Sequence, residues 1–408
     1  MILSGAAMTS AVYAESYGFR NEKGLSYPVA AAYDNKYTNI QWQTEAAENI
    51  GVPVPYGESV LLPKGQEILR LSETDGTQMA AIKLPETVSE SCSGVMYGNT
   101  LVQPTKSGIS LIDFTNGEVT ASRTFDGDID SNCAVIDDMA YFSVETDGTE
   151  TFYCVDLKEQ LKDIWSYSTD AEITSPTVQG DLVIFGAGDK LVTHHYKDES
   201  FAEIPLGAEI SGAPFASQYA VFYTDTDGNV CKLRLNDDGT MEEDTLTKCA
   251  VGAFPSAPLE RAGKLYVSSE TGLHILDSVN MEIAHSFDTI KKGSDPFVCY
   301  GNGQRVYCVG LNEGKWELHC ILDEGEDNAP TDEILAIMEN YESGRSAVSA
   351  NATLYFRDGI GRLYALTKIE YDIVSIVFKL IILLLIIAGI FLWIRMIGKR
   401  RAANNPRY

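Results

Sequence analysis

The feature that most constrains this chain is an internal repeat with a period of about 42 residues. Each copy has a strand-like segment, a turn with small or polar residues, and a second strand-like segment. Eight copies occur, at 59–72, 100–114, 139–157, 182–196, 220–235, 264–277, 305–322 and 352–366. Marker residues in the second segments, spaced 37 to 44 residues apart, are Leu69, Leu111, Cys154, Leu191, Lys232, Ile275, His319 and Leu363.

A repeat of this length, built from short alternating strands with turns between them, is typical of the blades of a β-propeller. A single four-stranded blade buries little surface, so the blades must pack face to face around an axis. The sequence therefore predicts an all-β protein whose residues 37–367 form a propeller of eight four-stranded blades. A seven-bladed ring with one irregular insertion is the alternative.

Several copies share an opening segment that ends in proline. It occurs as Thr-Ser-Pro at 174–176, Gly-Ala-Pro at 212–214, Ser-Ala-Pro at 256–258 and Ser-Asp-Pro at 294–296. Since proline cannot donate to a sheet ladder, it suits the start of a strand. We expect this segment to open the innermost strand of each blade.

The combined pattern of Ser-x-Pro, Gly-x-Leu-Tyr-Ala-Leu and a later tryptophan resembles the pyrroloquinoline-quinone-like repeat, and 362–366 is its clearest copy. The family includes quinone-dependent alcohol and glucose dehydrogenases, which hold the quinone against two adjacent cysteines and bind calcium. This sequence has no Cys-Cys dipeptide. The resemblance therefore implies the family's other class, non-catalytic envelope propellers that act as scaffolds, and we expect no enzyme activity, cofactor or metal.

Two segments bear on how the ring is completed. The eighth copy lacks an outer strand, and 38–43, which contains Trp42, is predicted to supply it and close the ring. The stretch 331–341 fits either an inserted amphipathic helix, with Thr331 as N-cap, or the outer strand of the seventh blade.

The segment 373–394 contains 22 residues with a single charge, Lys379. A helix of this length spans a bilayer core, with Lys379 snorkelling and Trp393 at the opposite interface. Basic residues follow at Arg395, Lys399, Arg400 and Arg401. By the positive-inside rule, the sequence predicts a single-pass protein of the cell membrane, with the lipid bilayer as one partner. The propeller would be extracellular and the tail 395–408 cytoplasmic.

The amino terminus is consistent with export. Residues 1–14 end in Val-Tyr-Ala, which resembles a signal-peptidase site, and we interpret them as the remnant of a signal peptide. Residues 15–36 form an N-terminal extension. The formal net charge of −27, from 31 basic and 58 acidic residues, argues against a nucleic-acid partner and favours cationic ligands or basic partners.

Other polar motifs have a structural explanation. Asp225 to Asn229 resembles the start of a calcium loop, but position 235 is Leu where a bidentate Glu is needed. Asp-Gly pairs at 75–76, 147–148, 227–228 and 238–239 are predicted to be hairpin turns. His194 and His195 are neighbours on a strand, so they point to opposite faces and do not share a metal.

The chain has eight cysteines, and export makes disulfides feasible. Cys308 and Cys320 are equidistant from Gly314, and Cys231 and Cys249 are equidistant from Thr240. Three candidate disulfides follow from the sequence, with Cys154 and Cys299 left as buried thiols: Cys308–Cys320, Cys231–Cys249 and Cys92–Cys133.

These features predict a binding or scaffold module at the cell surface, with a protein partner at the membrane. An accessory role for a membrane transporter or envelope assembly complex fits this geometry. The alternative is an extracellular enzyme, or a receptor for a small molecule or glycan, with its site in the propeller funnel. Clustered carboxylates at the funnel would favour the enzyme, whereas an apolar rim patch would favour a protein partner. The ligand cannot be identified from the sequence.

Overall fold

The computed structural model describes residues 37–129, 131–292, 297–299, 305–323, 329–337, 347–350, 353–358 and 360–368, together with parts of 381–396. It divides into two compact units, Met1–Lys368 and Ile369–Tyr408, and each is described here by itself. The N-terminal segments 1–14 and 15–36, predicted to be a signal remnant and an extension, lie outside the described residues.

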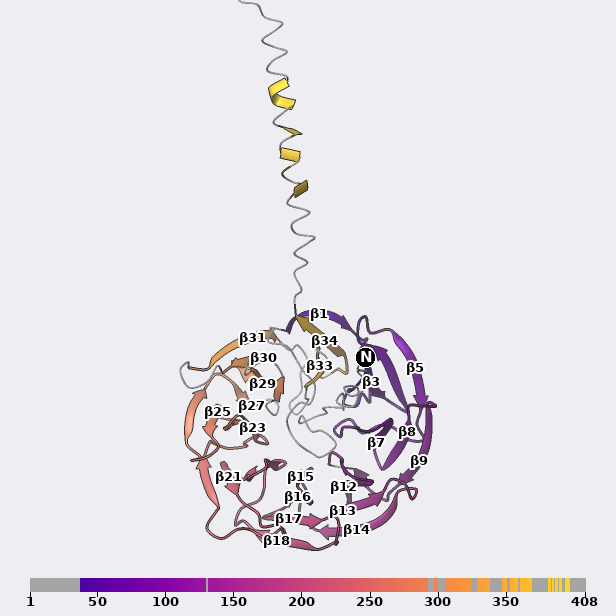
Figure 1. Ribbon diagram of the computed structural model, residues 1–408, viewed down its shortest axis with the longest axis vertical. Coiled ribbons are helices and arrows are strands. Elements are labelled where there is room, and N and C mark those ends of the chain that lie inside the picture. Colours follow the sequence, from indigo (N-terminus) through magenta and orange to yellow (C-terminus); the bar gives the residue numbers. More distant parts are fainter. Residues whose placement is uncertain are drawn as a thin grey trace, which may run out of the picture. The chain divides into compact units, whose positions relative to one another are not determined.

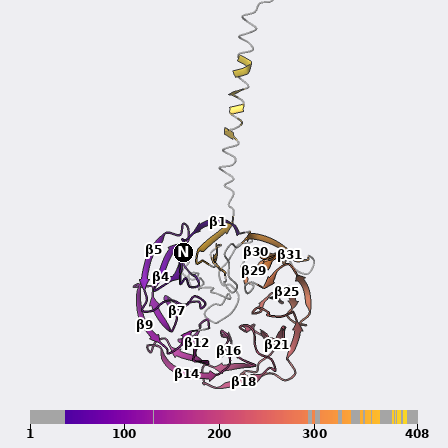
Figure 2. The same cartoon turned by 180° about the vertical axis from the view of Figure 1, so that it is seen from behind.

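The described residues of the first unit form eight antiparallel sheets arranged as the blades of a ring (Figure 1). This confirms the eight-bladed prediction and excludes the seven-bladed alternative. Within each blade the strands follow one another from the axis to the rim, and Figure 2 shows the ring from its other face. All eight marker residues of the repeat lie on the third strand of their blade.

The first four blades are built from consecutive strands. Blade 1 contains β2 (Val54–Tyr56), β3 (Ser59–Lys64), β4 (Glu67–Ser72) and β5 (Gln78–Lys83). Blade 2 contains β6 (Val95–Tyr97), β7 (Thr100–Pro104), β8 (Gly108–Asp113) and β9 (Glu118–Thr124). Blade 3 contains β10 (Asp128–Ile129), β11 (Ala134–Ile136), β12 (Met139–Thr146), β13 (Thr149–Asp156) and β14 (Lys162–Thr169). Blade 4 contains β15 (Thr177–Gln179), β16 (Leu182–Ala187), β17 (Lys190–His195) and β18 (Phe201–Pro205).

The remaining blades continue the pattern. Blade 5 contains β19 (Phe215–Ala216), β20 (Val221–Thr224), β21 (Asn229–Leu233) and β22 (Thr247–Ala250). Blade 6 contains β23 (Leu259–Arg261), β24 (Lys264–Ser269), β25 (Gly272–Asp277) and β26 (Ile283–Phe287). Blade 7 contains β27 (Lys291–Lys292), β28 (Phe297–Cys299), β29 (Arg305–Asn312), β30 (Lys315–Leu322) and β31 (Thr331–Ile337). Blade 8 contains β32 (Ala347–Ala350), β33 (Thr353–Arg357), β34 (Leu363–Lys368) and β1 (Tyr37–Gln43).

Blades 3 and 7 have an inner strand in two pieces. In blade 3 both β10 and β11 pair with β12, and in blade 7 both β27 and β28 pair with β29. The stretch 331–337 is strand β31, which pairs with β30, so the outer-strand alternative for this segment is correct.

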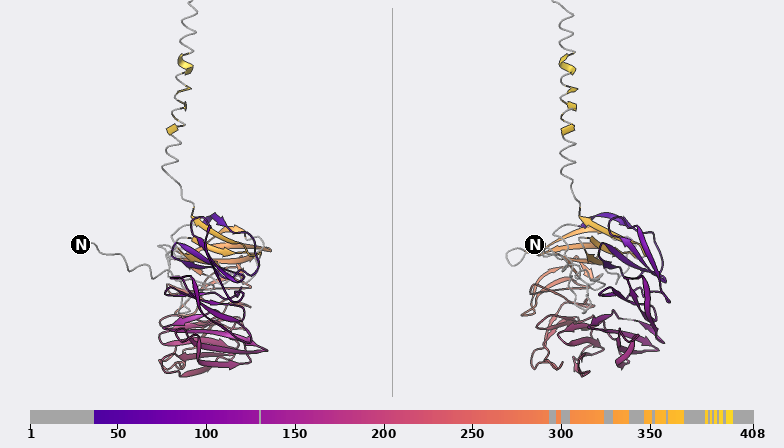
Figure 3. Two further views of the ribbon diagram at one scale, coloured as in Figure 1. Left: turned by 90° about the vertical axis from the view of Figure 1, so that its right-hand side faces the viewer. Right: turned by 45° about the vertical axis from the view of Figure 1, so that its right-hand side comes forward.

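The apolar core lies in the seams between neighbouring blades. The second strands are buried along nearly their whole length, as in β16, whereas an outer strand such as β9 alternates between exposed and half-buried residues. A strand that is covered on both faces has apolar residues at consecutive positions in the sequence. One seam packs Val60 and Leu62 of blade 1 against Tyr355 and Leu363 of blade 8. Figure 3 shows the ring from its side.

The ring is closed by its first and last strands. Strand β1 pairs antiparallel with β34, with Ile40 opposite Leu366, which confirms the prediction for 38–43. Trp42 is buried in the seam between blades 8 and 1, and its indole Nε1 donates to the carbonyl of Glu73 at 2.7 Å. Pairing of the two ends leaves the last blade with four strands like the others.

The opening segments have a common local function. The side chain of Ser131 accepts the backbone N–H of Ser143 at 2.7 Å, Thr174 accepts that of Gly186 at 2.8 Å, and Ser256 accepts that of Ser268 at 3.0 Å. In blades 4 and 6 the hydroxyl lies just before the inner strand, and in blade 3 it lies between the two pieces of that strand; in each case it bonds the second strand of the same blade. The prolines at 176, 214 and 258 directly precede the inner strands β15, β19 and β23.

The Asp-Gly pairs are turns between strands, as predicted. Gly148 and Gly228 have φ of 83° and 85°, and Gly239 has φ of 81°. Gly76 has φ of 70° and also lies under the indole of Trp42, since a Cβ added there would be 2.8 Å from that ring. Glycine is required at this position by both the backbone and the packing.

The second unit contains the predicted membrane segment. The described residues between 381 and 396, which include Trp393 and Arg395, are helical. Within these described residues no helix is long and apolar enough to cross a bilayer. The other four predicted anchor residues, Lys379, Lys399, Arg400 and Arg401, lie outside the described part of the chain. The membrane span stays a prediction.

Candidate functional site

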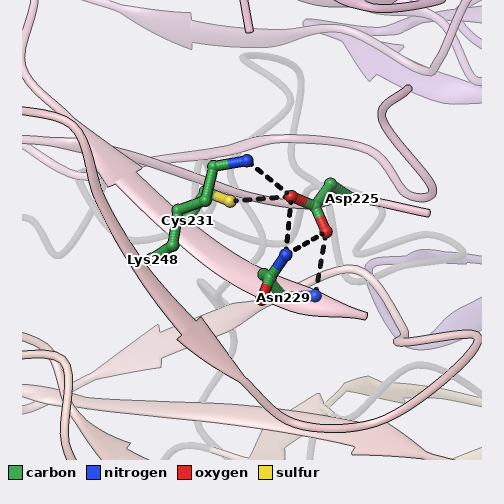
Figure 4. A network of polar contacts seen from close by, with 4 residues as sticks. All are labelled: Asp225, Asn229, Cys231 and Lys248. Carbon is green, nitrogen blue, oxygen red and sulfur yellow. Dashed lines mark hydrogen bonds and ion pairs between the residues drawn. The ribbon is translucent and has the colours of Figure 1, made fainter. Parts of the chain in front are cut away.

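The buried carboxylates are the natural place to look for reactive chemistry. Asp225, in the sequence that resembles a calcium loop, is fully buried. Its carboxylate accepts from the Asn229 backbone at 2.9 Å, the Asn229 side chain at 2.9 and 3.1 Å, the Cys231 thiol at 3.4 Å and Lys248 at 3.0 Å (Figure 4). Burial alone raises the pKa of Asp225, but the bonds from Asn229 and Lys248 outweigh it and the pKa is lowered. This carboxylate joins β21 to β22 through bonds to Asn229, Cys231 and Lys248.

The other buried carboxylates of the described residues are engaged in the same way. Asp323 accepts from Lys264 at 2.7 and 2.8 Å and from the Tyr266 hydroxyl at 2.8 Å, which ties blade 7 to blade 6. Asp358 accepts from Arg362 within blade 8 at 2.8 Å. Glu150 accepts the N–H of Ile173 at 2.9 Å, and Glu317 accepts from the Asn312 amide at 3.1 Å. All five act as structural acceptors.

Buried histidines are also part of the blades. His274 bonds the hydroxyls of Thr271 and Ser286, each at 2.9 Å, and burial lowers its pKa. His194 and His195 do point to opposite faces, as the sequence predicts. His194 is 1% exposed and lies in the seam between blades 3 and 4. No group of three or more metal-binding side chains occurs among the residues that the structure describes.

An open cleft of about 800 Å³ lies between blades 4 and 5, which are neighbours in the ring (Figure 2). We call it the blade 4–5 cleft. From blade 4 it is lined by the turn between β15 and β16, at 178–182, and by His195 at the end of β17. From blade 5 it is lined by 216–219, the turn between β19 and β20, and by 235–237 after β21. The same turn of two successive repeats therefore forms its two walls.

The two walls are joined by a hydrogen bond. The amide Nε2 of Gln179 donates to the carbonyl of Ser217 at 2.6 Å, across the boundary between the blades. The Ser217 hydroxyl accepts the backbone N–H groups of Tyr219 at 3.2 Å and Ala220 at 3.1 Å. The turn that carries Tyr219 is therefore held by its own side chain, and Tyr219 projects from it, 75% exposed.

The charge of the cleft is small. Asp181 forms an ion pair with Lys197 at 2.6 Å, and this hydrogen bond lowers the pKa of Asp181. Asp237 is exposed, and its carboxylate has no partner within the described part of the chain. The cleft thus combines amides, hydroxyls, one paired and one unpaired carboxylate, and an exposed aromatic ring. This arrangement is suited to binding.

The cysteine pairs do not form the candidate disulfides. None of the seven cysteines among the described residues is in a disulfide. Cys308 lies opposite His319 and Cys320 lies opposite Tyr307, so the two thiols point to opposite faces of the blade. Cys231 and Cys249 lie opposite Lys248 and Val230, with the same result. Cys92 and Cys133 do share one cluster between blades 2 and 3, where their thiols contact the carbonyls of Ile129 and Ala134. Cys299 is among the residues whose side chains are not described.

The sequence analysis did not identify the blade 4–5 cleft, because its lining comes from four separate segments. The available signal was the polar tip of two equivalent turns, Gln-Gly-Asp at 179–181 and Ser-Gln-Tyr at 217–219. A tyrosine at the tip of a short hairpin has no neighbouring strand to cover it. The position of Tyr219 in this turn therefore predicts an exposed aromatic side chain.

Comparison with known proteins supports the fold. No protein-family model matches the sequence, and no curated protein matches it either. Among solved structures, BamB from Moraxella catarrhalis is similar, with a TM-score of 0.59 and 12% identity over 81% of this chain and 99% of that chain. A quinohemoprotein alcohol dehydrogenase from Pseudomonas putida gives a TM-score of 0.60 and 9% identity over 86% of this chain and 78% of that chain.

A europium-containing methanol dehydrogenase gives a TM-score of 0.61 and 8% identity, over 85% of this chain and 90% of that chain. These identities establish the fold and leave the activity open, since one fold serves many functions. The repeats, the eight closed blades and these similarities agree, and the chain has the fold of an eight-bladed β-propeller.

Proposed function

We propose that this chain is a non-catalytic binding module, anchored in the cell membrane by 373–394, with an extracellular propeller that presents a ligand or partner site. Its role is accessory to a membrane transporter or an envelope assembly complex. The observation that carries the proposal is the difference between the buried carboxylates, which are bonded, and the polar side chains that line the blade 4–5 cleft. The five buried carboxylates are engaged in structural bonds, whereas two exposed side chains that line the blade 4–5 cleft, Gln218 and Asp237, have no partner among the described residues.

Two sequence features support the membrane location. The segment 373–394 is apolar over a length that suits a bilayer, and the residues after it are basic. The net charge of −27 favours a partner with a basic surface.

The experiment is cross-linking in native membranes, followed by affinity purification of tagged protein. The full-length chain is compared with a chain that ends at Lys368, the boundary of the propeller unit. We expect the full-length form to copurify with a stoichiometric membrane protein and to fractionate with membranes. The truncated form should lose the membrane fraction.

Two outcomes contradict the proposal. If the full-length chain is found in the soluble fraction, the membrane anchor is wrong. If no protein copurifies and the truncated form binds a small ligand unaided, the propeller is itself the receptor. This receptor is the second candidate function, and the blade 4–5 cleft is the feature that favours it.

A further inference from the structure

We infer that the blade 4–5 cleft binds a short, uncharged saccharide, with the ring of Tyr219 stacked on a sugar face and the polar side chains of the cleft bonded to its hydroxyls. This deepens the binding role proposed above and rests on it.

Tyr219 is positioned to act as a stacking platform. Its side chain is 75% exposed, and the turn below it is held by the two bonds to the Ser217 hydroxyl. An exposed aromatic ring on a fixed turn loses little conformational freedom when a flat apolar surface covers it. The C–H face of a pyranose is such a surface, and the ring hydroxyls point outward from it toward the walls.

The walls offer groups that match hydroxyls. Gln218 and Asp237 have side chains without partners in the described part of the chain, and both line the cleft. Gln179 uses its Nε2 on Ser217, so its Oε1 remains an acceptor, and Asn236 uses its Nδ2 on Thr240 at 2.9 Å. A sugar hydroxyl both donates and accepts, so it can bond carboxylate and amide groups at once.

Charge separates the ligand classes. An anionic ligand is disfavoured because the protein carries a net charge of −27 and the cleft itself contains Asp181 and Asp237. A cationic ligand would find only Asp237 unpaired, because Lys197 already pairs with Asp181 at 2.6 Å. A single exposed ion pair contributes little to affinity. A neutral ligand with many hydroxyls can bond both the amide groups and the unpaired carboxylate of the lining.

The cleft also has a suitable size. About 800 Å³ falls within the range of pockets that bind small molecules. The interblade bond from Gln179 to Ser217 fixes the spacing of the two walls before any ligand binds, which lowers the cost of ordering the site.

The test uses the full-length protein, purified in a detergent without a sugar headgroup, because a glycosidic detergent would compete. The probes are maltotriose, cellotriose, mannotriose and triacetylchitotriose, and binding is measured by saturation-transfer NMR and calorimetry. We expect at least one probe to bind with a millimolar or lower Kd. Tyr219→Ala should weaken that binding by about tenfold, while Tyr219→Phe should stay within about twofold.

Asp237→Asn should weaken binding by about threefold, since it replaces two acceptor oxygens by one. Phe201→Ala is the matched control, because Phe201 is another exposed aromatic residue, 54% exposed, on the outer strand of blade 4, and does not line the cleft. It should leave the Kd unchanged. Thermal unfolding of each variant checks that the propeller is intact.

Three results would overturn the inference: none of the four saccharides binds, Tyr219→Ala binds like the wild type, or pentalysine displaces the bound saccharide. These outcomes are distinct from failure of the proposed function. A membrane partner that copurifies equally with Tyr219→Ala and wild type leaves the scaffold role standing when saccharide binding fails.

Discussion

The imidazole of His194 and the indole of Trp165 lie in parallel across the seam between blades 3 and 4, with ring centroids 4.0 Å apart and an interplanar angle of 19°. His194 is on the third strand of its blade, and Trp165 is on the outer strand of the blade before it. Among the residues that the structure describes, neither nitrogen of His194 has a hydrogen-bond partner. A titratable group therefore occupies a position where only its neutral form fits.

The first prediction concerns the pH dependence of stability. Burial, and then the neighbouring His195, lower the pKa of His194 from 6.5 to about 4. Between these values the unfolded chain binds a proton that the folded chain does not, so stability falls as the pH decreases. We expect a loss of about 2 kcal/mol between about pH 7 and about pH 5 from this residue, measured by urea unfolding. His194→Phe keeps the stacking and should remove this part of the slope; an unchanged slope would show that His194 does not cause it.

The second prediction concerns the Asp323 bonds between blades 6 and 7. Asp323→Ala leaves Lys264 and Tyr266 without their acceptor in a buried site and should destabilise the propeller by about 3 kcal/mol. Tyr266→Phe should cost about 1 kcal/mol, since only one neutral donor is lost. The control is Lys158→Ala, which removes an exposed ion pair with Asp138 and should not shift the urea midpoint. Equal effects for Asp323→Ala and Lys158→Ala would refute the argument.

The third prediction concerns closure of the ring. Trp42→Ala removes a buried indole and its bond to Glu73, and should cost about 3 kcal/mol. Trp42→Phe should recover part of this loss by filling the seam beside Tyr355. We further expect limited proteolysis to cut 37–43 first in Trp42→Ala. A variant as stable and as resistant as the wild type would mean that β1 is not needed for closure.

The fourth prediction concerns the thiols. Burial raises the pKa of Cys133 and Cys231 to about 12 and that of Cys154 to about 11, so these groups should resist alkylation in the folded protein. Cys249 is only half-buried and should react first among the cysteines of the described part. Peptide mapping after brief alkylation, with Cys249→Ser as the control, locates the label. A peptide pair linked through Cys308 and Cys320 would contradict the observed register.

The sequence predicted the blades well because each blade repeats the same local pattern. The second strand is apolar along most of its length and recurs with a period of about 42 residues, and Asp-Gly pairs mark several of the turns. The closing strand was predictable because the eighth copy has no outer strand of its own. Its tryptophan supplied the second clue, and the structure places Trp42 in the expected seam.

Two of the cysteine pairs, Cys308–Cys320 and Cys231–Cys249, failed for a geometric reason. The prediction placed the mirror point of one hairpin on Gly314, which assumes a turn with a single central residue. The turn contains two, Glu313 and Gly314, and Asn312 pairs with Lys315. The register therefore shifts by one residue, and in a strand this moves a side chain to the other face. The cleft was missed for a different reason, since it depends on contacts between residues in separate blades.

The pairing of β1 with β34 also sets when the propeller can be finished during synthesis. Strand β1 is made first, yet its partner lies roughly three hundred residues later in the chain. At about 5–20 residues per second, β1 waits on the order of half a minute with its hydrogen-bonding edge unpaired. Through that interval the nascent chain is an open arc. Its last seam forms only when Lys368 has left the ribosome. Until then both ends of the arc expose unpaired strand edges, and these edges are available to a chaperone or to another unfolded chain.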